Sequence, residues 1–155
     1  MKILILFLLI IAGATFLAAM IAFEINKLGK IADRAKTLQN QDLGNPSQVN
    51  QLGQSIQLYK QCDRLIANSP WLRIAVNFSI IDKKAYSNNA NHIQQEIDRR
   101  HRFQRLFAQG ECHINDKYFD RGLHSFLQAN QLFNTDELQS RIVRCQSQLE
   151  GQKKY

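Results

Sequence analysis

The chain has 155 residues, with 20 Lys and Arg against 13 Asp and Glu, a formal net charge of +7 and 45% hydrophobic residues. This length allows one small core and excludes a two-domain enzyme. The charge is unevenly distributed, because residues 3–23 contain no charged side chain and nearly all of the charge follows them.

Residues 3–23 form an uninterrupted apolar segment, ILILFLLIIAGATFLAAMIAF. As a helix it would be about 32 Å long, close to the hydrocarbon thickness of a bilayer, which is about 30 Å. We therefore predict a transmembrane anchor over residues 1–23. A cleaved signal peptide is the alternative, with Ala12, Gly13 and Ala14 as its cleavage site, but cleavage there would leave a strongly apolar mature terminus.

Basic residues gather directly after the apolar segment and predict its orientation. Only Lys2 precedes the segment, whereas four basic residues follow it closely: Lys27, Lys30, Arg34 and Lys36. Because Lys and Arg are enriched on the cytoplasmic side, we expect a single-pass protein of the bacterial inner membrane whose carboxyl-terminal domain is cytoplasmic rather than periplasmic. The three cysteines agree, since an odd and irregularly spaced set is typical of reduced thiols.

Residues 24–38 continue the helical pattern with an apolar residue every third or fourth position. We predict a juxtamembrane amphipathic helix here, continuous with the anchor, whose apolar stripe packs either in a short coiled coil or on the chain's own domain. Residues 39–48 predict a linker, because they collect residues that favour turns: Gly44, Asn45, Pro46 and Ser47.

Residues 49–155 have apolar residues at helical spacing throughout and no alternating strand pattern. The predicted fold class is all-α, with an N-terminal transmembrane helix followed by a small antiparallel helical-hairpin domain of about five helices of roughly 14–24 residues. Helix boundaries are expected at Ser69 and Pro70, at residues 87–89, at Asn115 and at Thr135. Between the first two boundaries, the expected apolar stripe includes Phe78.

Residues 106–134 carry small and large apolar residues at regular offsets: Leu106, Gly110, Phe119, Gly122, Phe126 and Ala129. This pattern resembles a tetratricopeptide repeat, a helix–turn–helix unit of about 34 residues. The resemblance implies that the two glycines let two helix backbones approach closely, with the aromatic rings beside them. Residues 58–71 resemble the second half of an earlier repeat, whereas residues 71–89 fit no repeat pattern.

The resemblance also implies a protein partner held in a concave groove that is lined by the first helix of the pair. The exposed residues of that face would be Arg100, Gln104, Glu111 and Asn115; the same residues are also what a plain polar surface contains. The basic run at residues 99–105 has interleaved aromatic residues, which raises nucleic acid as a ligand. Neighbouring Glu96 and Asp98 weaken the positive patch, so we expect a solvated or lipid-facing surface and no nucleic acid, with an acidic protein partner as the alternative.

No arrangement of residues typical of catalysis is recognisable. Cys112 and His113 are adjacent, so on a helix they would point about 100° apart and could not share one metal ion. We therefore predict a protein that is not an enzyme, with no metal, cofactor or catalytic residue. The predicted function is a membrane-anchored adaptor or accessory subunit of an integral-membrane protein complex, in contact with lipid and with a protein partner. The alternative is an exported, envelope-spanning structural protein with a periplasmic helical domain. Residues 141–155, RIVRCQSQLEGQKKY, resemble the tail of phage inner-membrane lysis proteins, which have an anchor and a helical body of similar size.

Overall fold

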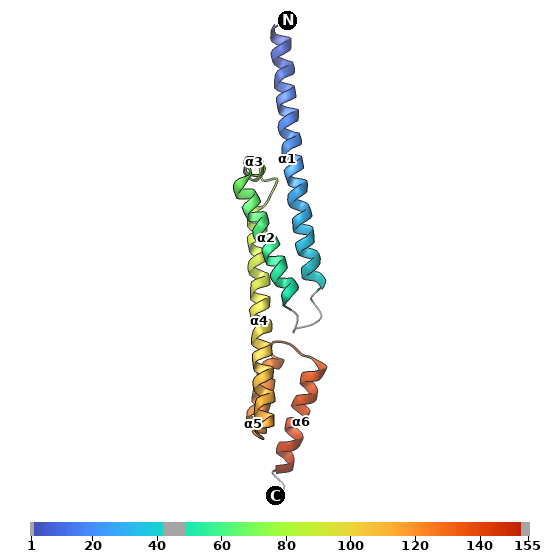
Figure 1. Ribbon diagram of the computed structural model, residues 1–155, viewed down its shortest axis with the longest axis vertical. Helices are drawn as coiled ribbons and strands as arrows, with labels where there is room; N and C mark the ends of the chain where they lie inside the picture. Colours follow the sequence, from blue (N-terminus) through green and yellow to red (C-terminus); the bar gives the residue numbers. More distant parts are fainter. Residues whose placement is uncertain (1, 42–48, 153–155) are drawn as a thin grey trace. The chain divides into compact units, whose positions relative to one another are not determined.

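The computed structural model describes residues 2–41 and 49–152, and these residues form six helices and no strand (Figure 1). The all-α fold class is therefore confirmed. In chain order, the helices are α1 (Lys2–Gln41), α2 (Asn50–Asn68), α3 (Pro70–Asn77), α4 (Lys83–Asn115), α5 (Phe119–Asn130) and α6 (Asp136–Gln152). The five helices after residue 49 range from 8 to 33 residues, a wider range than expected.

Helix α1 is one continuous helix of 40 residues. The expected anchor and the expected juxtamembrane helix are thus two parts of one element. The first part is apolar, and α1 is long and apolar enough to cross a membrane. Residues 39–41, expected in the linker, are still helical, because they continue the last turn of α1. The turn-forming residues of that linker lie outside the described residues.

Contacts divide the described residues into two compact units. Unit 1 contains α1, α2, α3 and the part of α4 that ends at Gln94; unit 2 contains the rest of α4, together with α5 and α6. The apolar stripe of residues 24–38 packs on the chain's own helices, which is one of the two expected arrangements, and Leu28 and Ala35 of this stripe are buried. Residues 49–155, predicted to form one domain, contribute to both units.

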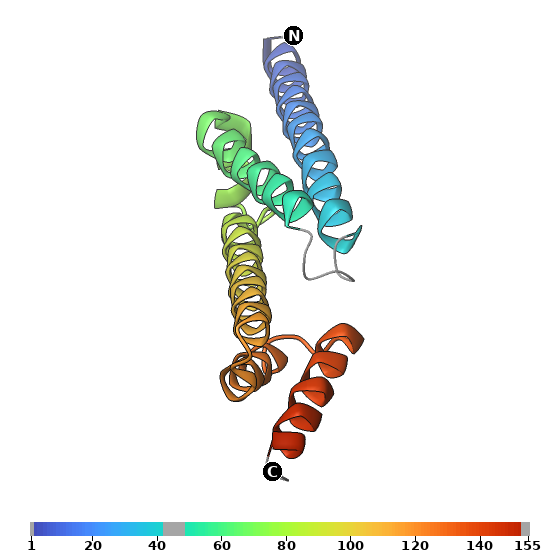
Figure 2. The ribbon, with the colours of Figure 1, turned by 60° about the horizontal axis from the view of Figure 1, so that its bottom comes forward.

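The core of unit 1 is aliphatic. It is formed by side chains from α1 to the start of α4: Leu28, Cys62, Ile66, Leu72, Ala75 and Ile81. Helices α1 and α2 lie side by side in both ribbon views (Figures 1 and 2). They are joined where the hydroxyl of Ser55 donates a hydrogen bond of 2.8 Å to the carbonyl of Ala35, and both residues are completely buried.

Helix α3 begins as predicted and ends earlier than predicted. Pro70 is its first residue, and the Ser69 hydroxyl accepts a hydrogen bond of 3.3 Å from the N–H of Leu72, which confirms the expected cap. The break expected at residues 87–89 is wrong. The chain leaves the helix after Asn77, because Ser79 adopts a left-handed φ of 57°. Helix α4 then runs through residues 87–89 without interruption.

The core of unit 2 is built around aromatic rings. Its buried members are Phe103, Ile114, Phe126, Ala129, Leu138, Ile142 and Cys145. The boundaries expected at Asn115 and Thr135 are confirmed: α4 ends at Asn115, and the Thr135 hydroxyl accepts a hydrogen bond of 3.2 Å from the N–H of Leu138 at the start of α6. Unit 2 holds all six residues of the repeat pattern over residues 106–134.

Candidate functional site

The six positions of the repeat pattern lie in the core of unit 2. Phe126 and Ala129 are completely buried, and Leu106 and Phe119 pack against the same cluster. The glycines lie at the closest approach of α4 and α5. A Cβ added at Gly110 would come within 2.5 Å of Cε1 of Phe126, and one added at Gly122 would come within 3.4 Å of the Gly110 carbonyl oxygen. The structure therefore brings these residues together at a helix crossing, whereas assignment to a repeat family stays a prediction.

The four candidate partner-binding residues differ in accessibility. Asn115 is exposed, and Gln104 and Glu111 are half-buried. Arg100, expected to be exposed, is only 2% exposed, so this expectation is wrong. Its guanidinium Nε lies 3.1 Å from Oε1 of Glu96, one turn earlier on α4. That carboxylate compensates the charge, and the long aliphatic stem of arginine tolerates burial.

Glu111 connects α4 to α6. Its Oε1 lies 2.7 Å from Nε of Arg141, and each side chain is about one third exposed. The N–H does not point along a hydrogen-bond direction, so the contact is an ion pair rather than a directed hydrogen bond. Arg141 was not singled out from the sequence, since nothing in the pattern of α6 shows which helix its polar face meets. The candidate partner-binding surface therefore consists of Gln104, Glu111 and Asn115 from α4 and Arg141 from α6.

Most charged side chains of the basic run on α4 are exposed, but Arg99 and the aromatic residues contact the chain itself. Arg99 donates a hydrogen bond to the carbonyl of Leu132, and its guanidinium carbon lies 4.4 Å from the centre of the Phe133 ring. Phe103 is buried, and Phe107 packs on the same cluster, with its ring centre 5.5 Å from that of Phe126. The aromatic rings of the run thus serve the core, whereas base stacking needs exposed rings. That the chain binds no nucleic acid stays a prediction.

The buried thiols are held in the protonated form. Burial raises the pKa of Cys62 to about 11, with the nearby charge of Asp63 as a second cause, and burial also raises the pKa of Cys145. Protonated thiols are weak nucleophiles and weak metal ligands. Across residues 2–41 and 49–152, no group of three or more His, Cys, Asp or Glu side chains lies close enough together to hold a metal ion.

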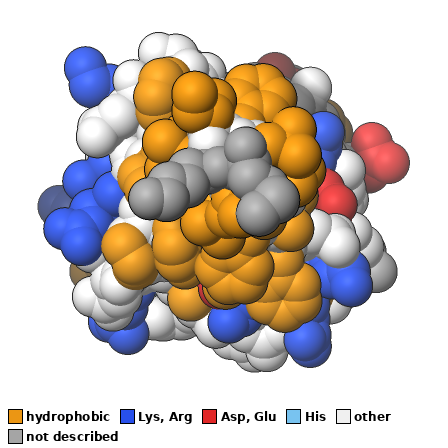
Figure 3. All heavy atoms as spheres, turned by 90° about the horizontal axis from the view of Figure 1, so that it is seen from above, with side chains coloured by type: hydrophobic (Ala, Val, Ile, Leu, Met, Phe, Trp, Pro, Cys, Tyr) orange, Lys and Arg blue, Asp and Glu red, His pale blue; other side chains and the backbone are white. Residues whose placement is uncertain are grey.

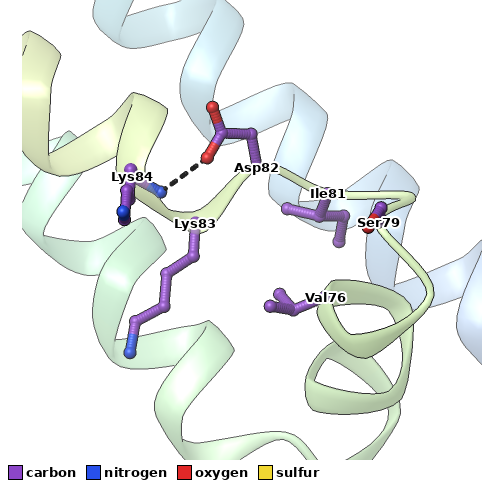
Figure 4. A pocket seen from close by; sticks show the side chains of 6 residues that line it. All are labelled: Val76, Ser79, Ile81, Asp82, Lys83 and Lys84. Carbon is purple, nitrogen blue, oxygen red and sulfur yellow. Dashed lines mark hydrogen bonds between the residues drawn. The ribbon is translucent and has the colours of Figure 1, made fainter.

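A groove open to solvent lies in unit 1, between the end of α3 and the start of α4 (Figure 4). Its volume is about 450 Å³, and its lining combines apolar and basic side chains: Val76, Ser79, Ile81, Asp82, Lys83 and Lys84. The Asp82 carboxylate accepts a hydrogen bond of 2.9 Å from the N–H of Lys84, which fixes the first turn of α4. The sequence did not indicate this groove, because Phe78 and Ile81 were expected on the face of one uninterrupted helix.

Comparison of the chain with family models, with curated proteins and with solved structures finds no match. The function must therefore be inferred from the surfaces described above.

Proposed function

We propose that this chain is a single-pass membrane protein whose helical units act as an adaptor or small accessory subunit of an integral-membrane complex. The observation that carries the proposal is the exposure of α1. All side chains at positions 3–11 are large, hydrophobic and exposed, and Phe16, Leu17 and Phe23 are exposed as well. Figure 3 shows hydrophobic side chains gathered on the face seen from the amino-terminal end of α1. A continuous apolar surface of this length is unfavourable in water, and a bilayer covers it.

The charges that follow the span support a cytoplasmic domain at the bacterial inner membrane. Four basic side chains on the second part of α1 are exposed: Lys27, Lys30, Arg34 and Lys36. They lie within the distance from the span over which Lys and Arg determine orientation.

A reporter fused to the carboxyl terminus tests this orientation. A reporter that is active only outside the cytoplasm should give no signal, and one that is active only inside should give a strong signal. The reverse result would assign the chain to the exported, envelope-spanning class of structural proteins.

The partner-binding part of the proposal is supported by the candidate surface on unit 2. This surface is polar, reachable from solvent and held in place by the ion pair between Glu111 and Arg141. Glu111 of this surface follows Gly110, where α4 meets α5. The pattern of that helix pair resembles tetratricopeptide repeats, and the resemblance implies that the pair holds a peptide or a partner helix. Protein-binding surfaces of this kind combine a rigid scaffold with accessible polar side chains.

Purification under gentle conditions tests partner binding, with two matched substitutions on α4. We expect a stoichiometric partner to be recovered with the full chain from its native membrane. Gln104→Arg should reduce that recovery, because it introduces a charge and a longer side chain on the surface. Gln109→Arg makes the same change at an exposed position that lies about 140° around the helix axis from Gln104, and it should leave recovery unchanged. Recovery of the chain as a clean monomer would contradict the adaptor function.

A further inference from the structure

The end of unit 1 formed by residues 70–84, here called the tip, exposes two large hydrophobic side chains. Phe78 is 75% exposed and Ile80 is 59% exposed. The tip itself is well packed, since Leu72 and Ala75 are completely buried and Ile81 is nearly so. Two outward apolar side chains on a firmly packed segment indicate a surface that contacts something apolar.

Two backbone hydrogen bonds close the turn that follows α3. The N–H of Ser79 donates to the carbonyl of Val76, and the N–H of Ile80 donates to that of Ala75, both at 2.9 Å. With Ser79 in the left-handed region, this is a Schellman ending, in which the residue at the position of Ile80 commonly packs back on its helix. Ile80 does not pack back on α3 but is exposed. Ser79, which is not a glycine, adopts the left-handed conformation at a cost of about 1–2 kcal/mol.

The tip lies at the level where α1 would leave the bilayer. Burial along α1 begins at Met20 and Ile21, and Ile21 packs against the cluster that contains Leu72 and Ala75 of α3. Residues 3–20, which precede this contact, span about 27 Å as a helix, close to a hydrocarbon core of about 30 Å. The helix turn at Ile21 is therefore at the boundary between hydrocarbon and headgroups, and α3 lies beside it (Figure 1). This step depends on the proposed function, since it takes α1 as the membrane span.

The side chains of the tip have the composition of a membrane interface. Trp71 is half-buried, and tryptophan is enriched at the headgroup level of membranes. Arg73, Lys83 and Lys84 are exposed, and they outnumber the single exposed acid of the tip region, Asp82. In the groove, Val76 and Ile81 lie on one side and Lys83 on the other (Figure 4). Apolar side chains beside basic ones match the acyl chain and the phosphate of an anionic phospholipid.

We propose that the tip rests in the interface of an anionic lipid bilayer, with Phe78 and Ile80 among the upper acyl chains and with the basic side chains at the phosphates. Unit 1 then has a second membrane contact besides α1, and this contact fixes its orientation against the membrane surface. A protein partner is the competing occupant. The bilayer is favoured because the contact between α3 and α1 itself places the tip at the membrane surface, and because the charge of the tip is complementary to anionic headgroups.

The fluorescence of Trp71 tests the proposal without a label, because it is the one tryptophan of the chain. The full chain is reconstituted into vesicles of phosphatidylethanolamine and phosphatidylglycerol whose acyl chains carry bromine at either a shallow or a deep position. We expect stronger quenching of Trp71 by shallow bromine than by deep bromine. Fluorescence that neither lipid quenches would overturn the proposal.

Substitutions at the exposed pair test which side chains make the contact. The double variant Phe78→Ser with Ile80→Ser should lose most of the shallow quenching and shift the emission to the red. Val143→Ser, at an exposed position of α6 that is also 59% exposed, should change neither. Quenching that is equal in the double variant and the unchanged chain would overturn the assignment, provided that circular dichroism shows equal helix content.

A second tryptophan position separates failure of the tip from failure of the anchor. The double variant Trp71→Phe with Phe16→Trp places the indole within the apolar part of α1. If deep bromine quenches the indole at position 16 but no lipid quenches Trp71, the proposed membrane contact of the tip is overturned and the proposed anchor stands. If neither position is quenched, both proposals are overturned. Quenching of Trp71 that appears only with several copies per vesicle would assign the surface to a second copy of the chain and overturn lipid contact.

Discussion

The two units bring their helices together by different means. Unit 1 spreads an aliphatic core along the second half of the 40-residue α1, with small residues such as Ala35 and Ser55 at the crossing of α1 and α2. Unit 2 packs the 12-residue α5 on α4 around phenylalanine rings, and the Phe126 ring lies directly against Gly110. Phe126 is the one large side chain among the buried residues of α5, and its rigid ring leaves no room for a side chain at Gly110. We therefore expect unit 2 to tolerate changes in volume less well than unit 1.

Adding a methyl group at Gly110 should have the largest effect. In Gly110→Ala, the new Cβ would overlap three atoms of the buried Phe126 ring, the nearest at 2.5 Å. We expect a loss of about 3 kcal/mol in the free energy of unfolding, because neither the ring nor the helix can move freely. Denaturation of the full chain in mild detergent, with hydrogen exchange to read each unit, measures this loss.

Gly53→Ala in α2 is the matched control, since a Cβ there meets nothing within 4 Å. This variant should gain about 0.5–1 kcal/mol through helix propensity. Equal effects of the two variants would contradict the difference between the units.

Removal of Arg100 tests whether this residue serves the fold or a partner. Arg100→Ala should lower the stability of unit 2 by about 2 kcal/mol, because it empties a buried position and removes the ion pair between Arg100 and Glu96, which keeps its contact with Arg99. Arg102→Ala, at an exposed position of the same helix, should cost less than about 0.5 kcal/mol. If Arg100→Ala is as mild as Arg102→Ala, Arg100 returns to the candidate partner-binding surface. Thermal unfolding followed by circular dichroism measures both.

Loss of the Ser55 hydroxyl should have a smaller effect, on unit 1. Ser55→Ala removes the buried hydrogen bond to the Ala35 carbonyl, and we expect a cost of about 1 kcal/mol. Ser147→Ala removes an exposed hydrogen bond within α6 and should be close to neutral. A cost at Ser55 as large as that at Gly110 would show that unit 1 is equally sensitive at its helix crossing.

The smallest expected effect is the pH dependence due to Asp63. Burial raises the pKa of this carboxyl, and the Lys83 ammonium partly offsets the rise. A raised pKa in the folded state means that the carboxyl stabilises unit 1 at a pH below its unfolded pKa of about 4, and that this contribution is lost as the pH rises through the folded value. Asp63→Asn should therefore raise the melting temperature slightly at pH 7, and the gain should shrink as the pH approaches 4. A gain that grows on acidification would contradict this sign.

The sequence predicted elements whose signals are local. Ser69 with Pro70 and Thr135 with Asp136 are helix starts that need only a capping hydroxyl and the free N–H groups next to it, and both are confirmed. The end of α3 was missed, because the apolar Phe78 continues the helical spacing and Ser79 is not the glycine that usually marks a left-handed residue. The break predicted at residues 87–89 is wrong, because Ser and Asn are tolerated within a long helix whose Ala90 and Ile93 are buried.

By itself, the sequence determined that the chain is helical and that it begins with a helix long and apolar enough to cross a membrane, because composition and spacing within one segment decide both. Only the tertiary structure decided which polar residues are buried and which apolar ones are exposed. Arg100 is buried beside Glu96 although its charge predicts a surface, and Phe78 is exposed although its ring predicts a core. The burial of a side chain depends on which other helices pack against its own, and spacing along one helix does not contain that information.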